Sequence, residues 1–297
     1  MVLNLPGYES VFEKRRKDPT ETLTKRAGEI IVALDGSGDT DSLLEAINQV
    51  ESGGVILIKE GTYILTSAVT ISKSNIVIKG SGFSTIIKNT ARGNLLTATS
   101  KNNLVFDNLK FWNDWTFSGQ TNACIDMTSC TDSRIINCFF LFGEIAIKLT
   151  TCTNIVINNC NCDGNASANS VVYLSGSNYC FIYGNYLSSV NDYFCYLTGS
   201  SNHNNFFDNE GGAGTTMFYI TGSSYNAIIG NIAAEGAAWG EELTMAGDSN
   251  LNIINANIFP NDGINITAAT CDKNIVTSNI ATITNSGTGT IVANNTI

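Results

Sequence analysis

Asparagine returns along this chain at nearly regular intervals, each time after a short apolar run. The nine positions are Asn108, Asn137, Asn159, Asn185, Asn209, Asn231, Asn257, Asn279 and Asn295, and only the last interval is clearly shorter than the others. A repeat of roughly 20 to 30 residues built from short β-rich runs is the sequence signature of a solenoid.

A single repeat of this kind cannot bury its own apolar face, so the units must stack on one another. Stacked strands lie about 4.8 Å apart, which places equivalent residues of successive units directly above one another. The asparagines are then expected to form a ladder, because each side-chain amide both donates and accepts hydrogen bonds.

The composition narrows the class of protein further. Only 14% of the residues are charged, three are proline, and the net charge is −10. An acidic chain of this kind makes nucleic acid an unsuitable partner, because phosphate binding needs a basic face. No apolar stretch is long enough to cross a bilayer as a helix, so no membrane span is predicted. The first residues lack the basic start and apolar run of a signal peptide.

The nine cysteines also follow the repeat. Stacking would place Cys130 on Cys152 and Cys138 on Cys160, about 5 Å apart, within the range for disulfides. We favour buried free thiols, because parallel Cβ directions in stacked strands suit the S–S torsion poorly. With no C-x-x-C pair and His203 as the single histidine, no metal site of cysteines or histidines is predicted.

Residues 1–30 differ from the rest in holding most of the arginine. We interpret them as an N-terminal arm, either a solvated terminus or an attachment or oligomerisation segment. Residues 31–297 form the solenoid domain. Ser42 and Glu45 make a capping box that predicts a helix over residues 41–51, which would cap the exposed first coil.

Several motifs near the N-terminus resemble the first coils of the pectate-lyase-like (pectin-lyase-fold) superfamily. They are Asp35-Gly-Ser-Gly-Asp39, Leu44-x-Ala-Ile47, Gly53-Gly-Val-Ile-Leu-Ile58, Glu60-Gly-Thr-Tyr63 and Ile78-Lys-Gly-Ser-Gly82. The resemblance implies an all-β, right-handed, single-stranded parallel β-helix of three sheets, here with about ten coils and an N-terminal capping α-helix. Members of that superfamily include pectin-degrading lyases, polygalacturonases, other glycanases and viral tailspikes.

The catalytic motifs of the polygalacturonase-like and pectate-lyase sets do not occur in this sequence. No residue is therefore carried over as catalytic, and whether the protein is a glycoside hydrolase, a polysaccharide lyase or no enzyme stays open.

The sequence offers its own candidates in the loop that follows each asparagine. Acidic residues recur there, and we expect them to line one side of the solenoid beside aromatic rings. Rings stack on sugar faces and carboxylates accept hydroxyl hydrogen bonds, so this pattern suits a glycan. The alternative is that these are ordinary solvated loop acids. The candidate catalytic residues are Asp163, Asp192 and Glu144, and the candidate substrate-binding residues are Trp112, Asp114, Trp115, Tyr193, Glu235, Trp239 and Asp262.

Carboxylates one and two coils apart would be about 5 and 10 Å apart, which brackets the retaining and inverting glycosidase geometries. The sequence thus favours a surface- or virion-associated protein that binds polysaccharide and is a candidate for cleaving it. The alternatives are a non-catalytic structural or adhesive β-helix and, less favoured, a pectinolytic lyase. We expect no cofactor, with Ca²⁺ as the one candidate ion. Adjacent apolar residues in the strands predict an outward apolar stripe and a homo-oligomer, with a trimer as the working hypothesis.

Overall fold

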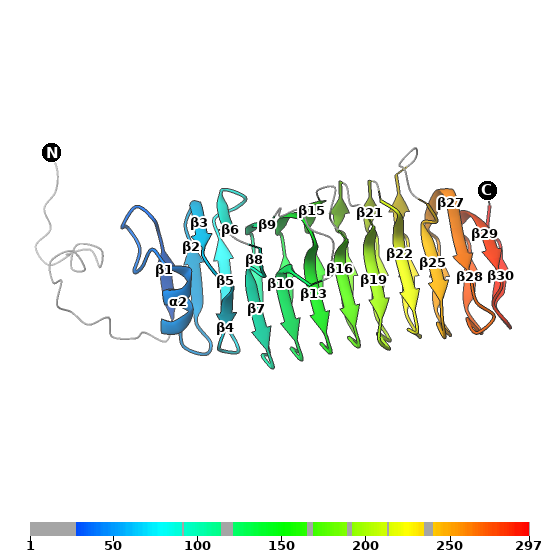
Figure 1. Cartoon of the computed structure of the whole chain (residues 1–297), viewed down its shortest axis with the longest axis horizontal. Helices are drawn as coiled ribbons and strands as arrows, with labels where there is room; N and C mark the ends of the chain where they lie inside the picture. The colour runs from blue at the N-terminus through cyan, green and yellow to red at the C-terminus, as the bar shows by residue number, and fades with distance from the viewer. Residues whose placement is uncertain are drawn as a thin grey trace, which may run out of the picture.

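The computed structural model describes residues 28–90, 92–113, 121–164, 169–188, 192–212, 214–234 and 240–296. In these residues the chain is a parallel β-solenoid of about ten turns, drawn in Figure 1 as a row of stacked coils. All recorded strand pairings are parallel and join each coil to the next. The expected all-β solenoid is confirmed.

Each coil runs through three strand positions. The first position builds a twelve-stranded sheet. Its strands are β1 (Glu29–Val32), β2 (Val55–Ile58), β5 (Val77–Gly80), β8 (Val105–Asp107), β11 (Arg134–Ile136), β14 (Val156–Asn158), β17 (Phe181–Tyr183), β20 (Asn205–Phe207), β23 (Ala227–Ile229), β26 (Ile253–Asn255), β28 (Ile275–Thr277) and β30 (Ile291–Ala293).

The other two positions belong to one eighteen-stranded sheet. We call them the first column and the second column. The first column contains β3 (Gly61–Leu65), β6 (Thr85–Asn89), β9 (Lys110–Asn113), β12 (Phe139–Phe142), β15 (Asn161–Gly164), β18 (Tyr186–Leu187), β21 (Glu210–Gly211) and β24 (Ile232–Ala233). The second column contains β4 (Val69–Ile71), β7 (Leu96–Thr99), β10 (Ala123–Thr128), β13 (Ile145–Thr150), β16 (Ser170–Ser175), β19 (Tyr193–Thr198), β22 (Thr216–Thr221) and β25 (Leu243–Ala246).

The two columns merge near the C-terminus. Strand β27 (Ile258–Ile266) pairs with β24 of the first column and with β25 of the second, and then with β29 (Ile280–Asn285). Hydrogen bonding therefore gives two continuous sheets instead of the three that were expected, because one long strand with a bulge bridges both columns.

The core is a stack of apolar side chains that point inward from every coil. In the three-residue strands of the twelve-stranded sheet from β8 to β28 the middle residue is buried, as in Phe106, Ile135 and Ile157, which the register places on one another. Alternate residues of a strand point to opposite faces, so one inward side chain per short strand builds a continuous interior column. Each coil is therefore stabilised by its two neighbours.

The nine periodic asparagines occupy two adjacent columns, and here the expectation of one column is wrong. Asn108, Asn137 and Asn159 have positive φ angles of 59°, 54° and 51° in the turn after the twelve-stranded sheet. The later coils place Gly184 or Asp208 at that position and bury the next residue, Asn185 or Asn209. Asparagine suits both positions because it tolerates the left-handed conformation and also bonds buried backbone.

The expected ladder exists in the second half of the solenoid. The Oδ1 atom of each asparagine accepts the backbone N–H of the asparagine one coil earlier, at 3.1 Å or less, and also its side-chain amide. Six residues form it: Asn185, Asn209, Asn231, Asn257, Asn279 and Asn295. A second buried row, Asn204, Asn226, Asn252 and Asn274, is bonded in the same manner.

All nine cysteines are free and buried, as favoured from the sequence. The stacked pair Cys130 and Cys152 interact through their sulfur atoms, and the hydrogen bond from Cys152 lowers the pKa of the Cys130 thiol to about 7. The same contact raises the pKa of Cys152. In the pair Cys138 and Cys160, burial and the neighbouring sulfur raise the pKa of Cys138.

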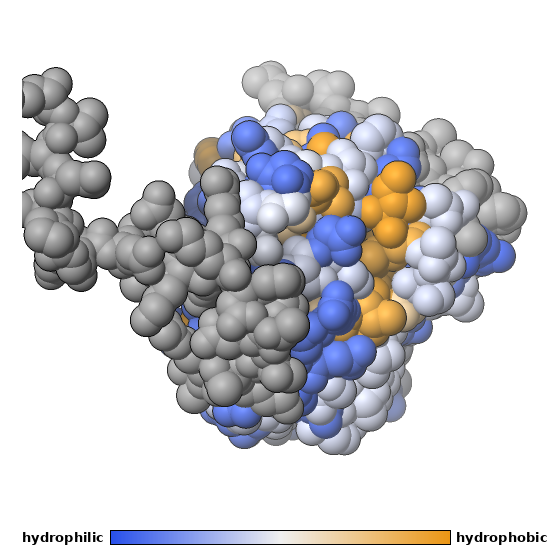
Figure 2. All heavy atoms as spheres, turned by 90° about the vertical axis from the view of Figure 1, so that its left-hand side faces the viewer, coloured by the Kyte–Doolittle hydropathy of each residue, from blue (hydrophilic) through white to orange (hydrophobic). Residues whose placement is uncertain are grey.

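One helix, α2 (Leu43–Gln49), occurs among the described residues, and Ser42 accepts the backbone N–H of Glu45 as its N-cap. It lies at the N-terminal end of the solenoid (Figure 1). Figure 2 looks at this end and shows apolar side chains beside polar ones. Leu34, Leu44 and Ile64, about half exposed, line one depression there. The N-terminal arm was expected over residues 1–30, and residues 1–27 of it lie outside the described residues. Among the described residues, no helix is long and apolar enough to cross a membrane.

Candidate functional site

The long turns between the first and second columns are where the sequence predicted the site. Residues 114–120, 165–168, 189–191 and 235–239 of these turns lie outside the described residues. Four predicted residues fall among them, namely Asp114, Trp115, Glu235 and Trp239. Their proposed roles stay predictions.

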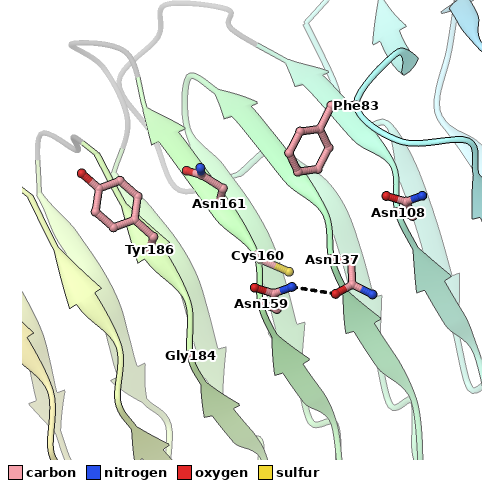
Figure 3. A pocket seen from close by; sticks show the side chains of 8 residues that line it. All are labelled: Phe83, Asn108, Asn137, Asn159, Cys160, Asn161, Gly184 and Tyr186. Carbon is pink, nitrogen blue, oxygen red and sulfur yellow. Dashed lines mark hydrogen bonds between the residues drawn. The ribbon is translucent and has the colours of Figure 1, made fainter.

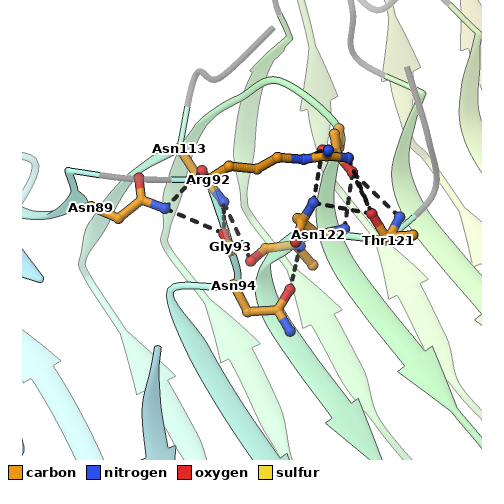
Figure 4. Close-up of polar contacts among 9 residues, drawn as sticks. Asn89, Arg92, Gly93, Asn94, Asn113, Thr121 and Asn122 are labelled. Atoms are coloured by element: carbon orange, nitrogen blue, oxygen red, sulfur yellow. Dashed lines mark hydrogen bonds and ion pairs between the residues drawn. The ribbon is translucent and has the colours of Figure 1, made fainter. Parts of the chain in front are cut away.

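Glu144 lies in the turn between β12 and β13 and is only 4% exposed. Its Oε1 accepts Arg92 Nε at 2.9 Å and Asn122 Nδ2 at 2.8 Å, and its Oε2 accepts the Asn122 backbone N–H at 3.0 Å. Thr121 adds two more donors. Figure 4 shows Arg92 reaching across this turn toward Thr121 and Asn122.

This network lowers the pKa of the Glu144 carboxyl. Burial acts to raise the pKa of the carboxyl, but the bonds from Asn122 and Arg92 outweigh it and hold the pKa below its usual value. A carboxylate that stays ionised and is bonded on both oxygens is suited to holding a turn together. It is poorly suited to donating a proton in catalysis.

Asp192 occupies the turn position that is equivalent to that of Glu144, two coils further on. Backbone hydrogen bonds link the two positions through the coil between them. The Asn169 N–H donates to the Glu144 carbonyl at 2.8 Å, and the Tyr193 N–H donates to the Asn169 carbonyl at 2.7 Å. The strand spacing separates these two positions by about 10 Å. Burial raises the pKa of Asp192, which is the direction that favours a proton donor.

Asp163 lies in a different row, on the outer face of the first column. The register pairs it with Leu141, which in turn pairs with Trp112, and its Oδ1 accepts the Ser188 hydroxyl at 2.6 Å. The acids thus do not form the single loop column that the sequence predicted. Asp163 within β15 and Asp192 in the turn before β19 face different surroundings, although both follow a periodic asparagine by a few residues.

Trp112 is half-buried and is covered on one face by Lys88, whose Nζ lies 3.5 Å from the ring centroid. Cation–π contact of this kind uses the ring face that would otherwise stack on a ligand. Asp262 is exposed, in the bulged part of β27 between Phe259 and Ile264.

A cluster of four tyrosines lies on the outer face of the second column. The register stacks Tyr173, Tyr196 and Tyr219 on consecutive coils. Neighbouring rings meet edge to face, with centroids 5.3 and 5.2 Å apart. Tyr193 lies 5.1 Å from Tyr196 and 5.3 Å from Tyr219. We call these four residues the tyrosine face.

Polar residues continue this row at both ends. On one side the register places Lys148 and then Asp126 next to Tyr173. On the other side it places Thr244 and then Asn265 next to Tyr219. Burial raises the pKa of Asp126 against the opposing effects of Lys148 and of its bond from Asn94. Asn265 Nδ2 donates to Glu241 at 3.0 Å.

Of the tyrosine face, the sequence prediction included Tyr193 alone. The missed residues carry a signal, because Tyr173, Tyr196 and Tyr219 recur at one constant interval and are each followed by a Leu or Ile and then a Ser or Thr. Among the described residues, no three His, Cys, Asp or Glu side chains group as metal ligands.

No protein-family model matches this sequence, and no curated protein matches it. Solved structures do match. An endo-xylogalacturonan hydrolase from Aspergillus tubingensis superposes with a TM-score of 0.68 at 13% identity, over 90% of this chain and 92% of the hydrolase. A tailspike protein of E. coli bacteriophage HK620, in complex with a pentasaccharide, gives 0.66 at 16% identity over 85% of this chain.

The Geobacillus virus E2 protein ORF18 also gives a TM-score of 0.66 at 16% identity, over 86% of this chain. The chain spans 57% of the length of that viral protein and 55% of the tailspike. At these identities the similarity establishes the fold. The protein therefore has a parallel β-helix fold, which is the fold that the motifs near the N-terminus predicted.

Proposed function

We propose that this protein binds polysaccharide along the tyrosine face, as a surface- or virion-associated β-helix protein. The observation that carries the proposal is the row of half-buried rings from Tyr173 to Tyr219, in line with Lys148 and Thr244. The fold neighbours support it, since their names describe a polysaccharide hydrolase and a tailspike bound to a pentasaccharide.

The chemistry of the face suits an extended glycan. Tyrosine rings offer apolar surface to the C–H faces of sugar rings, and their hydroxyls add hydrogen bonds at the ring tips. The coil spacing of about 4.8 Å repeats these contacts along the solenoid axis. Thr244 and Asn265 extend the same row with groups that bond sugar hydroxyls.

Cleavage of the bound glycan by Asp163 and Asp192 is the finer hypothesis. Asp192 has the environment of a general acid, because burial raises its pKa, and it directly precedes Tyr193 of the tyrosine face. Asp163 would act as the second carboxylate. Cleavage is then expected at pH values below the raised pKa of Asp192 and should decline as the pH rises above it.

The binding test is a panel of microbial and plant polysaccharides applied to the wild type, Tyr196→Ala and Tyr183→Ala. Tyr183 is a matched control, because it is also an outward-facing tyrosine but lies on the twelve-stranded sheet. Loss of stacking should weaken binding about tenfold or more in Tyr196→Ala and leave Tyr183→Ala unchanged. Equal binding by all three proteins would refute a role for the tyrosine face.

The cleavage test measures reducing ends released from any polysaccharide that binds, with Asp163→Asn and Asp192→Asn as variants. Loss of release in both, with binding retained, is the expected result. Release of unsaturated sugars, seen by the absorbance of the new double bond, would instead indicate a pectinolytic lyase.

A second candidate function is a structural or adhesive β-helix that assembles with copies of itself. Exposed isoleucines stack along the outer side of the twelve-stranded sheet, with Ile253 paired to Ile275 and Ile275 to Ile291. Ile232, Ile258 and Ile280 form a similar row on the first column. Exposed apolar rows of this kind suit association.

This hypothesis predicts a homo-oligomer, with a trimer as the first candidate, in which the arm of residues 1–30 assists assembly and helix α2 caps the free end. Light scattering after size-exclusion chromatography measures the mass directly. Ile275→Asp should dissociate the assembly. A monomeric wild type at all concentrations would refute it.

A further inference from the structure

A groove of about 460 Å³ follows the turn between the twelve-stranded sheet and the first column, on a different surface from the tyrosine face. Figure 3 shows it as a row of side chains that crosses several coils. Three stacked asparagines, Asn108, Asn137 and Asn159, form one side, and Asn161 lies nearby. None of these residues takes part in the function proposed above.

The three asparagines present a regular set of amides. All adopt positive φ, so the same left-handed turn is repeated on consecutive coils about 4.8 Å apart. Asn159 Nδ2 donates to Asn137 Oδ1 at 2.8 Å, and Asn108 Nδ2 donates to Gly80 O at 3.3 Å. Within the described part of the chain, no recorded donor reaches Oδ1 of Asn108 or of Asn159, so each retains capacity to accept a hydroxyl.

Two aromatic rings line the groove: Figure 3 shows Tyr186 at one end and Phe83 beside Asn137. Phe83 is 51% exposed and rests against Phe139 at a centroid distance of 5.5 Å. Tyr186 is 42% exposed. Gly184 lies between the asparagine row and Tyr186. Because glycine has no side chain, the groove stays open at that point.

None of the residues that line the groove is charged. The nearby Asp107 carboxylate is already engaged, since it accepts Asn137 Nδ2 at 2.8 Å and pairs with Lys79 Nζ at 2.9 Å. A ligand that bears carboxylates or phosphates would find no compensating charge among the lining residues. A ligand with many hydroxyls and apolar ring faces fits amides flanked by two aromatic rings.

We propose that this groove is a second glycan-binding site, specific for a neutral oligosaccharide, with Phe83 and Tyr186 stacking on sugar rings and the asparagine row bonding their hydroxyls. The inference rests on the polysaccharide binding proposed above and extends it to a separate surface. The chain would then hold a glycan at two places around the solenoid.

The test is titration calorimetry of the full chain with neutral gluco-, manno- and galacto-tetrasaccharides, and with tetragalacturonate as the charged comparison. At least one neutral tetrasaccharide should bind, and Tyr186→Ala should weaken it about tenfold. Tyr183→Ala, on the other side of the turn, should bind as the wild type does. Tetragalacturonate should not compete for this site.

Gly184→Asn provides a variant that adds a side chain to the lining of the groove without removing a packed ring. Asparagine tolerates the φ of +61° at this position, and an added Cβ would meet only the side-chain nitrogen of Asn158, at 3.3 Å. The variant should stay folded, as circular dichroism checks, and should lose neutral-glycan binding.

The outcomes separate this inference from the function proposed above. Neutral binding that is lost in Tyr196→Ala and unchanged in Tyr186→Ala and Gly184→Asn would overturn the groove site and leave the tyrosine face standing. Binding lost in Tyr186→Ala and retained in Tyr196→Ala supports the groove and refutes the tyrosine face for that glycan. Binding of no neutral tetrasaccharide would overturn the groove site.

Discussion

Asn231 Oδ1 accepts two hydrogen bonds from Asn209 of the preceding coil, one from the backbone N–H at 3.0 Å and one from the side-chain amide at 2.9 Å. Both asparagines are almost fully buried. One side chain therefore satisfies two donors that no water reaches, and it does so at the same position in successive coils. This relationship makes the ladder a structural requirement of the second half of the solenoid.

Asn231→Ala is expected to lower the free energy of unfolding by roughly 3 kcal/mol, because it leaves two buried donors of Asn209 without their acceptor and removes the bond from Asn231 Nδ2 to the Phe206 carbonyl. Urea unfolding followed by circular dichroism measures the change. Asn205→Ala, at an outward position of β20, should change stability by no more than about 0.5 kcal/mol. Similar effects at both positions would contradict the role of the ladder.

Glu144→Gln is expected to remove a pH-dependent part of the stability. The pKa of Glu144 is held below its usual value of 4.5 in the folded state. Its contribution is therefore complete above pH 4.5 and is lost as the pH falls through the folded pKa. Thermal unfolding between about pH 7 and pH 3 should show a gap between the wild type and Glu144→Gln that narrows as the pH falls.

Asp192→Asn is expected to have the opposite pH behaviour. Because burial raises the pKa of Asp192, the folded protein binds the proton of the Asp192 carboxyl group more tightly than the unfolded chain does. The wild type should thus lose stability relative to Asp192→Asn as the pH rises from 3.8 through the raised pKa. Asp262→Asn, at an exposed position, is the control. No pH-dependent difference between Asp192→Asn and the wild type would contradict the buried setting of this carboxyl.

The cysteines should react only when the protein unfolds. All nine are buried and free, so the native protein should resist a thiol reagent for as long as it stays folded. In denaturant without reductant, mass spectrometry should detect nine alkylated thiols. Cys130 has the lowered pKa, and in partial unfolding we expect it to be labelled before Cys152. Recovery of a linked Cys130–Cys152 peptide would refute the free-thiol arrangement.

The solenoid itself could be predicted from the sequence, because its cause is local. A short apolar run followed by a residue that tolerates the left-handed conformation specifies one strand and one turn, and repetition specifies the stack. The stacked, unpaired cysteines and the helix at residues 43–49 followed from the same local patterns.

Only the tertiary structure decided how the coils align. A difference of one residue in the position within a coil changes the surroundings of a side chain completely. Asn159 and Asn185 both fit the repeat, yet one lines a groove and the other is buried in the ladder. Asp163 and Asp192 both follow a periodic asparagine by a few residues but lie in different rows. The tyrosine face and the groove exist because residues far apart in the sequence are brought to adjacent coils. Such proximity depends on the stacking register, which no single segment of the sequence contains.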